Sequence, residues 1–289
     1  MREQSKYDIA DYPAVQRLIT DALHEDMPFG DMTTDSMVDD MQRAVANVVA
    51  KQRGIVAGAT VFGRVFQLLD ADVRIHYEAQ DGVLVADGDV VMRLEGKTAA
   101  LLKGERVALN LFGRMSGIAT KTRAYADQIA NLHASVTDTR KTTPGLRLLE
   151  KYAVKMGGGS NHRFSLSDGV LIKENHIKVA GGIAQAIALA KKSAPHTVKI
   201  EVETETLEEV KQAIQSKADI IMLDNMDNET MEQAVKMIGG RARTEASGNV
   251  SLDGVRNIRE IAQTGVDLIS VGSLTHSVEN FDFSMLIVG

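Results

Sequence analysis

Positive charge is concentrated in residues 138–178 of this chain. The segment holds eight Lys or Arg residues and four Asp or Glu residues, whereas the whole chain has a formal net charge of −6. Three groups of basic residues each follow a predicted turn or strand end: Arg140 with Lys141, His162 with Arg163, and Lys173. Arg pairs bidentately with carboxylates, and Lys is a point charge suited to phosphate. The three groups therefore indicate a pocket for a small anion.

A plainer interpretation applies to part of the segment. Arg147, Lys151 and Lys155 are spaced so that they lie on the polar side of a helix predicted over residues 146–156, and we expect them to be solvated. That helix does not explain the other basic residues.

Acidic residues follow two of the later predicted strands. Glu201 and Glu203 are two positions apart in one strand, so both point to the same face. Together with Asp224 on the next strand, Glu203 is suited to ribose hydroxyls or to Mg²⁺, which prefers oxygen ligands. Glu203 is equally able to pair with Lys173 in a buried salt bridge, and the sequence leaves both possibilities open.

Two segments of small residues are suited to a phosphate group. Residues 247–249 include Ser247 and Gly248, and residues 271–276 include Gly272 and His276. Both segments stand at predicted strand-to-helix turns, where free backbone N–H groups bind anions. Each is a weak signal by itself.

The elements that must position these residues alternate regularly after residue 131. Strands are predicted at residues 134–138, 170–173, 198–202, 220–223, 244–246 and 268–271, and helices at 146–156, 183–192, 207–216, 229–238 and 255–263. Strands that alternate with helices form a parallel sheet. Six in succession favour a closed or nearly closed β/α barrel, in which the working residues follow the carboxyl ends of the strands.

The first 115 residues predict an α+β domain. Within this domain, helices are expected at residues 13–26, 61–69 and 101–115, and strands at 43–51, 73–78, 83–85 and 90–94; a further helix is expected beyond it at 119–131. The two last helices are separated by an expected interruption at Ser116 and Gly117. Residues 25–35 are expected to form turns.

Composition excludes several classes of protein. The chain contains no Cys, which rules out disulfides, thiolate nucleophiles and Cys-based zinc sites. A net charge of −6 and the absence of Trp argue against a nucleic-acid partner. No apolar run is long enough to span a membrane, and the first residues are polar, so we expect a cytoplasmic protein.

One long motif resembles a known family. It reads TRKTTPGLRLLEKYAVKMGGGSNHRFSLSDGVLIKENHI and closely resembles the signature of quinolinate phosphoribosyltransferase, also called nicotinate-nucleotide pyrophosphorylase (carboxylating). Later blocks of the same family resemble IEVETETLEE, ADIIMLDNM, EASGNV and VGSLTHS, and earlier blocks resemble EDMPFGDMTTD and LLKGERVALN. The similarity runs from about residue 23 to residue 287.

The resemblance implies an N-terminal α/β sandwich domain followed by an incomplete β/α barrel. We place the first at residues 1–115 and the barrel at 116–276, and expect the tail 277–289 to pack back on the first domain. The implied reaction joins quinolinate to 5-phosphoribosyl-1-diphosphate, releases diphosphate and CO₂ and gives nicotinate mononucleotide for NAD biosynthesis. The implied cofactor is Mg²⁺, and the implied assembly is a homodimer with shared active sites.

The resemblance also implies roles for individual residues. The two quinolinate carboxylates would be bound by Arg140, His162, Arg163 and Lys173. The other substrate would be bound by Lys141 on its diphosphate side, Glu203 and Asp224 at the ribose and metal, and Ser247, Gly248, Gly272 and His276 around the phosphate. Arg106 would reach into the active site of the partner subunit.

Three alternatives accompany this interpretation. The apolar residues around Arg106 (Leu101, Leu102, Ala108, Leu109 and Phe112) either contact a partner subunit or pack only within their own domain. A related branch associated with molybdenum-transport operons shares the TRKT and GGG motifs and acts on another substrate, although the LIKENH block with Lys173 favours quinolinate. A barrel that binds anionic metabolites without turnover is a third possibility, which the combined basic and acidic residues disfavour.

Overall fold

The computed structural model describes residues 8–288 of this mixed α/β protein, so residues 1–7 and 289 of the predicted domain and tail lie outside it. The described chain divides into two compact units. The N-terminal unit comprises residues 8–123, Thr143–Gly158 and residues 277–288, and the barrel unit comprises Ala124–Thr142 and Gly159–His276. We predicted a domain limit between residues 115 and 116 from the order of helices and strands along the chain. That limit stays a prediction.

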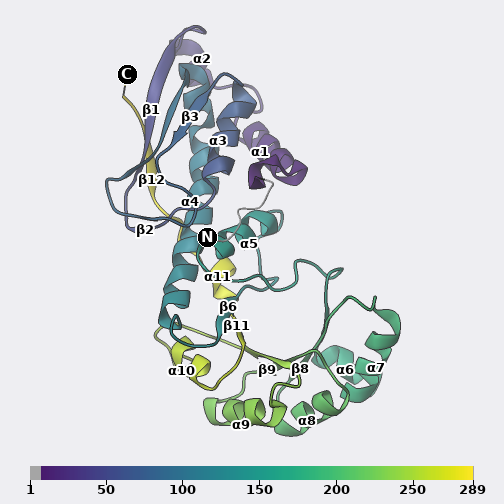
Figure 1. Cartoon of the computed structure of the whole chain (residues 1–289). Helices are drawn as coiled ribbons and strands as arrows, with labels where there is room; N and C mark the ends of the chain where they lie inside the picture. Colours follow the sequence, from purple (N-terminus) through teal and green to yellow (C-terminus); the bar gives the residue numbers. More distant parts are fainter. Residues whose placement is uncertain (1–7, 289) are drawn as a thin grey trace. The chain divides into compact units, whose positions relative to one another are not determined.

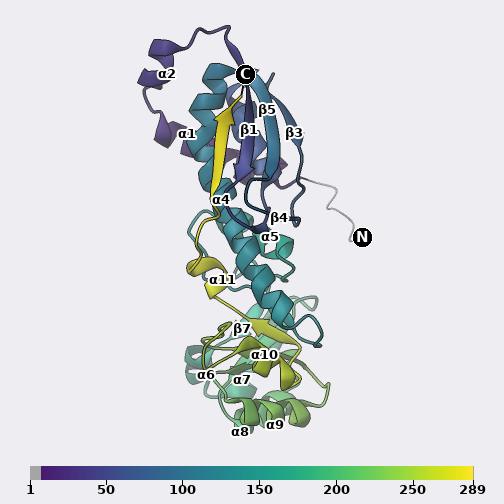
Figure 2. The ribbon, with the colours of Figure 1, turned by 90° about the vertical axis from the view of Figure 1, so that its left-hand side faces the viewer.

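The N-terminal unit contains a four-stranded antiparallel sheet in the order β12-β1-β5-β3. Its strands are β1 (Arg43–Ala50), β3 (Arg74–Tyr77), β5 (Val90–Lys97) and β12 (Phe283–Ile287). Strand β12, yellow in Figures 1 and 2, runs beside β1 with Val48 opposite Met285. Alternate residues of β1 are buried, as expected for a sheet with one face on the core.

The remaining elements of this unit are helices and a second, short pair of strands. They are η1 (Ile9–Asp11), α1 (Pro13–Asp26), α2 (Met32–Met37), the short pair β2 (Gly54–Ile55) and β4 (Leu84–Val85), α3 (Ala59–Leu69), α4 (Thr98–Gln128) and α5 (Arg147–Met156). Helix α2 stands where turns were expected, because Asp31 caps it by accepting hydrogen bonds from the N–H groups of Thr33 and Thr34. Helix α4 continues into the barrel unit.

The interruption predicted at Ser116 and Gly117 is wrong, because α4 is one continuous helix. Gly117 is required there for close packing: a Cβ atom at this position would lie 2.2 Å from the Glu279 carbonyl oxygen. Ser116 Oγ accepts a hydrogen bond from the Ala57 N–H at 3.0 Å. The small residues therefore let other backbone segments approach the helix, and they do not end it.

The apolar residues around Arg106 form the core of the N-terminal unit. Leu101, Ala108, Leu109 and Phe112 are all buried within the chain. The Phe112 ring stacks on Phe283 with centroids 4.2 Å apart and lies 5.3 Å from the Phe62 ring. These four residues therefore pack within their own domain, whereas Leu102 is half-buried, and a contact of that residue with a partner subunit stays a prediction.

Helix α5 also departs from its prediction. Lys151, which we expected to be solvated, is 2% exposed. Its neighbour Glu150 is fully buried and accepts hydrogen bonds from Arg114 and from the Thr143 N–H. Lys155 is exposed, as expected, and Arg147 is half-buried, so the polar face of α5 is covered at Lys151 but not along its whole length.

The barrel unit contains a six-stranded parallel sheet in the order β6-β11-β10-β9-β8-β7. Its strands are β6 (Ser135–Thr137), β7 (Val170–Ile172), β8 (Ile200–Thr204), β9 (Ile220–Asp224), β10 (Arg243–Ser247) and β11 (Leu268–Ser270). All six were predicted. Among the described residues β6 and β7 do not pair with each other, so the barrel is incomplete.

Helices α8 (Leu207–Gln215) and α9 (Asn228–Ile238) cover one face of this sheet (Figure 1). The other helices of the unit are α6 (Glu174–Ala180), α7 (Ile183–Ser193), α10 (Ile258–Gln263) and α11 (Ser273–His276). Helices α6 and α11 are short and were not predicted. Within residues 8–288, no helix combines the length and the apolar character needed to cross a membrane.

Candidate active site

A cavity of about 820 Å³ opens at the carboxyl ends of the barrel strands. Every predicted ligand of the barrel unit lines it: Arg140, Lys141, His162, Arg163, Lys173, Glu203, Asp224, Ser247, Gly248, Gly272 and His276. The parallel sheet explains this convergence, since all its strands end at the same edge.

Arg140 and Arg163 are brought together by the segment that follows the three glycines. Ser160 bridges to Thr137 at the end of β6, and its N–H donates to the Val136 carbonyl at 2.8 Å. This extra strand-like contact places His162 and Arg163 beside the residues that leave β6. Sequence positions more than 20 apart thus share one wall of the cavity.

The two guanidinium groups form an electrostatically unfavourable pair. Burial and the nearby Arg140 lower the pKa of Arg163, and Glu201 and Asp168 act in the opposite direction. Arg163 Nη1 donates to the Gly169 carbonyl at 2.8 Å. Arg140 Nε is buried without a hydrogen-bond partner. Because an unpartnered buried donor is costly, this wall is suited to an anion that accepts from both residues.

Lys173, which directly follows β7, forms an ion pair with Glu203 of β8. Lys173 Nζ lies 3.3 Å from Glu203 Oε2, and the Lys173 side chain is 49% exposed. The pair that the sequence left open is therefore present, but only Glu203 is largely shielded from solvent. Both groups remain on the cavity wall.

Asp224 and Gly248 belong to a tightly packed turn region. Asn225 Nδ2 donates to Asp224 Oδ2 at 2.7 Å, and the Asn225 N–H donates to the Ser247 carbonyl at 3.0 Å. Gly248 has φ +104°, and a Cβ atom there would lie 2.1 Å from Asn225 Oδ1. Arg256 joins the two strand ends by donating to the carbonyls of Met226 and Ser247. Glycine is therefore required at position 248.

Gly272 lets Lys141 cross the end of β11. A Cβ atom on Gly272 would lie 3.0 Å from Lys141 Cδ and 3.3 Å from the His276 ring. Thr275 Oγ1 donates to the Lys141 carbonyl at 2.7 Å, which anchors the backbone of this lysine. The Lys141 side chain is thereby directed along the cavity wall.

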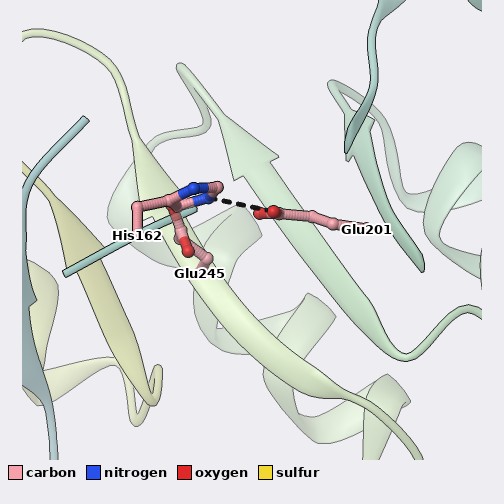
Figure 3. Close-up of side chains that lie close together, drawn as sticks. All are labelled: His162, Glu201 and Glu245. Carbon is pink, nitrogen blue, oxygen red and sulfur yellow. Dashed lines mark ion pairs between the residues drawn. The ribbon is translucent and has the colours of Figure 1, made fainter. Parts of the chain in front are cut away.

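One histidine and two glutamates, His162, Glu201 and Glu245, form a buried cluster (Figure 3), and His162 and Glu245 also line the cavity. His162 Nε2 lies 2.9 Å from Glu201 Oε2 and 3.6 Å from Glu245 Oε1. Glu201 and Glu245 are 3% and 1% exposed. Burial and the adjacent Glu201 raise the pKa of Glu245 to about 8, although His162 acts in the opposite direction. The Glu245 carboxyl group is therefore protonated at neutral pH.

The three ligating atoms of this cluster lie within 4.8 Å of one another, which is close enough for a metal ion. However, His162 Nδ1 accepts a hydrogen bond from the Arg163 N–H at 2.8 Å, so Nδ1 carries no proton. The proton of the neutral ring is then on Nε2, the atom that would have to bind the metal. Glu203 and Asp224 remain the better candidates for Mg²⁺ because they supply only oxygen atoms.

Several residues of the cavity were not predicted. They include Glu245, His176 and Asn225, and Asn225 has a left-handed backbone conformation with φ +53°. A glutamate within a predicted buried strand was the available signal for Glu245, because a buried carboxyl group needs a partner. Arg106 is exposed and lies in the N-terminal unit, so its role stays a prediction.

Comparisons with known proteins agree along almost the whole chain. Residues 31–116 match the N-terminal domain of quinolinate phosphoribosyl transferase, and residues 118–286 match its C-terminal domain. The chain is 45% identical to a probable nicotinate-nucleotide pyrophosphorylase [carboxylating] of Bacillus subtilis, over 94% of this chain and 92% of that protein. It is 41% identical to a quinolinate phosphoribosyltransferase [decarboxylating] of Nicotiana tabacum, over 92% and 80% of the two chains.

Two solved structures are also similar to this chain over nearly its whole length. NadC from Streptococcus pyogenes superposes with a TM-score of 0.91 at 42% identity, covering 95% of this chain and 97% of that one. The nicotinate-nucleotide pyrophosphorylase from Francisella tularensis superposes with a TM-score of 0.91 at 38% identity, covering 98% and 100%.

Proposed function

The chain belongs to the quinolinate phosphoribosyltransferase family, and from this premise we propose how its cavity carries out the reaction of that family. The reaction transfers the phosphoribosyl group of 5-phosphoribosyl-1-diphosphate to quinolinate. It releases diphosphate and CO₂ and leaves nicotinate mononucleotide, a precursor of NAD.

Quinolinate is bound by the wall that carries Arg140 and Arg163, together with Lys173. The observation that supports this assignment is the pair of neighbouring guanidinium groups, one with a buried Nε that has no partner. Two adjacent carboxylates on a planar ring match two planar cations. Nicotinate has one carboxylate and would leave part of this wall unpaired, which disfavours it as a substrate.

The second substrate, 5-phosphoribosyl-1-diphosphate, lies along the residues that follow β6, β10 and β11. Lys141 meets its diphosphate, and the backbone around Gly248 and Gly272, which lines the cavity, approaches its 5-phosphate. Ser247 and His276 complete this phosphate site.

Glu203 and Asp224 hold the ribose hydroxyls and Mg²⁺. Two carboxylates on one cavity wall fit this ion, which accepts a few protein oxygens and keeps waters or substrate phosphates as its other ligands. When bound, the ion neutralises negative charge on the diphosphate. The Lys173 ammonium group keeps Glu203 oriented toward the cavity.

The reaction in this cavity requires no covalent bond between a substrate and the protein. The quinolinate ring nitrogen attacks C1 of the ribose while the bond from C1 to the diphosphate oxygen breaks, so positive charge develops on the sugar. The ring nitrogen becomes a pyridinium, which accepts the electron pair left when CO₂ departs, and the ring carbon then takes up a proton. The role of the protein is to hold two anions in line with fixed cations.

The active form that we propose is a homodimer in which Arg106 of one chain completes the cavity of the other. Arg106 is exposed on α4, whereas the other proposed ligands line the cavity of the barrel unit. We also propose a cytoplasmic location.

A turnover assay tests the proposed function. Purified protein with Mg²⁺, quinolinate and 5-phosphoribosyl-1-diphosphate should form nicotinate mononucleotide and CO₂ in equal amounts. Nicotinate in place of quinolinate should give essentially no product. Comparable rates with the two acids would contradict the assignment of the Arg140 and Arg163 wall.

A further inference from the structure

Both ring nitrogens of His162 are already engaged by protein atoms. Nδ1 accepts the Arg163 N–H at 2.8 Å, and Nε2 lies 2.9 Å from Glu201 Oε2. An imidazole that accepts through Nδ1 is neutral and carries its proton on Nε2. The Nε2–H group therefore donates to Glu201, and in this arrangement no ring proton is directed at a ligand.

The peptide that carries Arg163 is fixed by this ring. The His162 N–H donates to Asp138 Oδ1 at 2.9 Å, and the next N–H, that of Arg163, donates to the His162 ring. At its other end Arg163 donates to the Gly169 carbonyl at 2.8 Å, and a Cβ atom on Gly169 would lie 3.2 Å from Arg163 Cβ. Arg163 is therefore held at its backbone and at its guanidinium group.

We propose that His162 is a neutral positioning residue that orients Arg163, and that Glu201 is a second positioning residue that fixes the ring of His162. This proposal rests on the proposed function, in which Arg163 binds quinolinate. It replaces direct binding of a quinolinate carboxylate by His162 with support from behind the cavity wall.

The hydrogen bond that Nδ1 accepts makes the ring neutral even though acidic residues surround it. His162 is faced by Glu201 from β8, by Glu245 from β10 and, at its backbone, by Asp138 after β6. The His162 side chain is 13% exposed, so it has little contact with solvent. A single Nε2–H can serve one carboxylate well, and it serves Glu201, since Glu245 lies beyond hydrogen-bond distance at 3.6 Å.

Two substitutions of His162 separate a positioning role from a direct one. His162→Asn retains an acceptor close to the position of Nδ1, and His162→Gln retains a donor close to the position of Nε2. If the ring orients Arg163, the Gln variant should lose roughly 10- to 100-fold in kcat/KM for quinolinate and the Asn variant clearly less, because misplaced binding groups cost that much. The loss should appear mainly in KM for quinolinate, with KM for the diphosphate substrate little changed.

A direct ligand would give the reverse order, with Gln the milder replacement, and that order would overturn the proposal. Glu201→Leu removes the acceptor of the Nε2–H, whereas Glu201→Gln retains one. We expect the Leu variant to be the more impaired, and its effect to be non-additive with His162→Gln because the two residues act in series. Additive losses would contradict the proposal. Glu208→Gln, an exposed residue of α8, is the matched control.

A spectroscopic measurement keeps the test independent of folding and turnover. Nitrogen-15 NMR of the wild-type histidine rings, with His162 identified by the signal lost in His162→Asn, reports which ring nitrogen carries a proton. We expect a protonated Nε2 and an unprotonated Nδ1 near neutral pH, with and without quinolinate. A doubly protonated ring, or a proton on Nδ1, would overturn the proposal even if the enzyme turns over quinolinate. Failure of turnover in the wild type would instead contradict the proposed function.

Discussion

Lys173 Nζ lies 3.3 Å from Glu203 Oε2 on the wall of the cavity. The Lys173 side chain is 49% exposed, and an ion pair with such access to solvent contributes only about 0–1 kcal/mol to stability. The proximity of these two residues is therefore better explained by a role in ligand binding than by a contribution to stability.

For this reason Glu203→Gln should reduce turnover by about 100-fold or more while leaving the melting temperature nearly unchanged. Steady-state rates over a range of Mg²⁺ concentrations and a thermal unfolding curve measure the two effects. Asp224→Asn should behave in the same way. A normal rate at saturating Mg²⁺ in both variants would exclude these carboxylates as ligands of the metal and ribose.

Arg106→Ala and Lys141→Ala should each be nearly inactive, because each removes a cation from every active site of the proposed dimer. When the two variants are mixed and allowed to exchange subunits, about half of the dimers should be heterodimers with one intact site. Activity should then recover to about a quarter of that of the wild type. No recovery after demonstrated exchange would mean that Arg106 acts within its own chain or has no role in catalysis.

Gly248→Ala should destabilise the protein and weaken binding of the diphosphate substrate. The new Cβ atom would lie 2.1 Å from Asn225 Oδ1, and Gly248 also has a backbone conformation with φ +104°. Gly88→Ala is a matched control, because Gly88 has φ +87° and a Cβ atom there would meet nothing within 4 Å. The control should cost about 1–3 kcal/mol through backbone strain alone. Chemical unfolding of both variants should show a larger loss for Gly248→Ala, and equal losses would contradict the packing described above.

The buried carboxyl group of Glu245 should make stability depend on pH. Burial raises the pKa of Glu245 to about 8, well above its value in the unfolded chain, so between these two values the folded state retains a proton that the unfolded state releases. The free energy of unfolding therefore falls as the pH rises through this interval and levels off above it. Glu245→Gln removes this dependence, so its stability relative to the wild type should be greater at pH 8 than at pH 5. Urea unfolding at the two pH values measures the difference, and an equal difference at both would contradict the raised pKa.

The strands of the barrel could be predicted because their signal is local. Short apolar runs such as those of β8 and β9 alternate with amphipathic helices, and that order alone specifies a parallel sheet. A parallel sheet then places whatever follows its strands at one edge, so Lys173, Glu203 and Asp224 could be predicted to lie together. The long motif around Arg140 and Arg163 could be related to a family for the same reason, since its residues are contiguous in the chain.

The contacts that the sequence could not supply are between residues far apart in the chain. Gly117 looks like a helix break until the carbonyl of Glu279 is known to pack against it, and Lys151 looks solvated until its own position on α5 is known to be covered. Likewise, its residue type suggested that His162 is a cation that binds a carboxylate. Its tautomer depends on the Arg163 N–H beside it and on Glu201, brought to it by the fold from another strand. The identity of each residue is fixed by the chain, but its protonation and its partners depend on distances that only the folded structure sets.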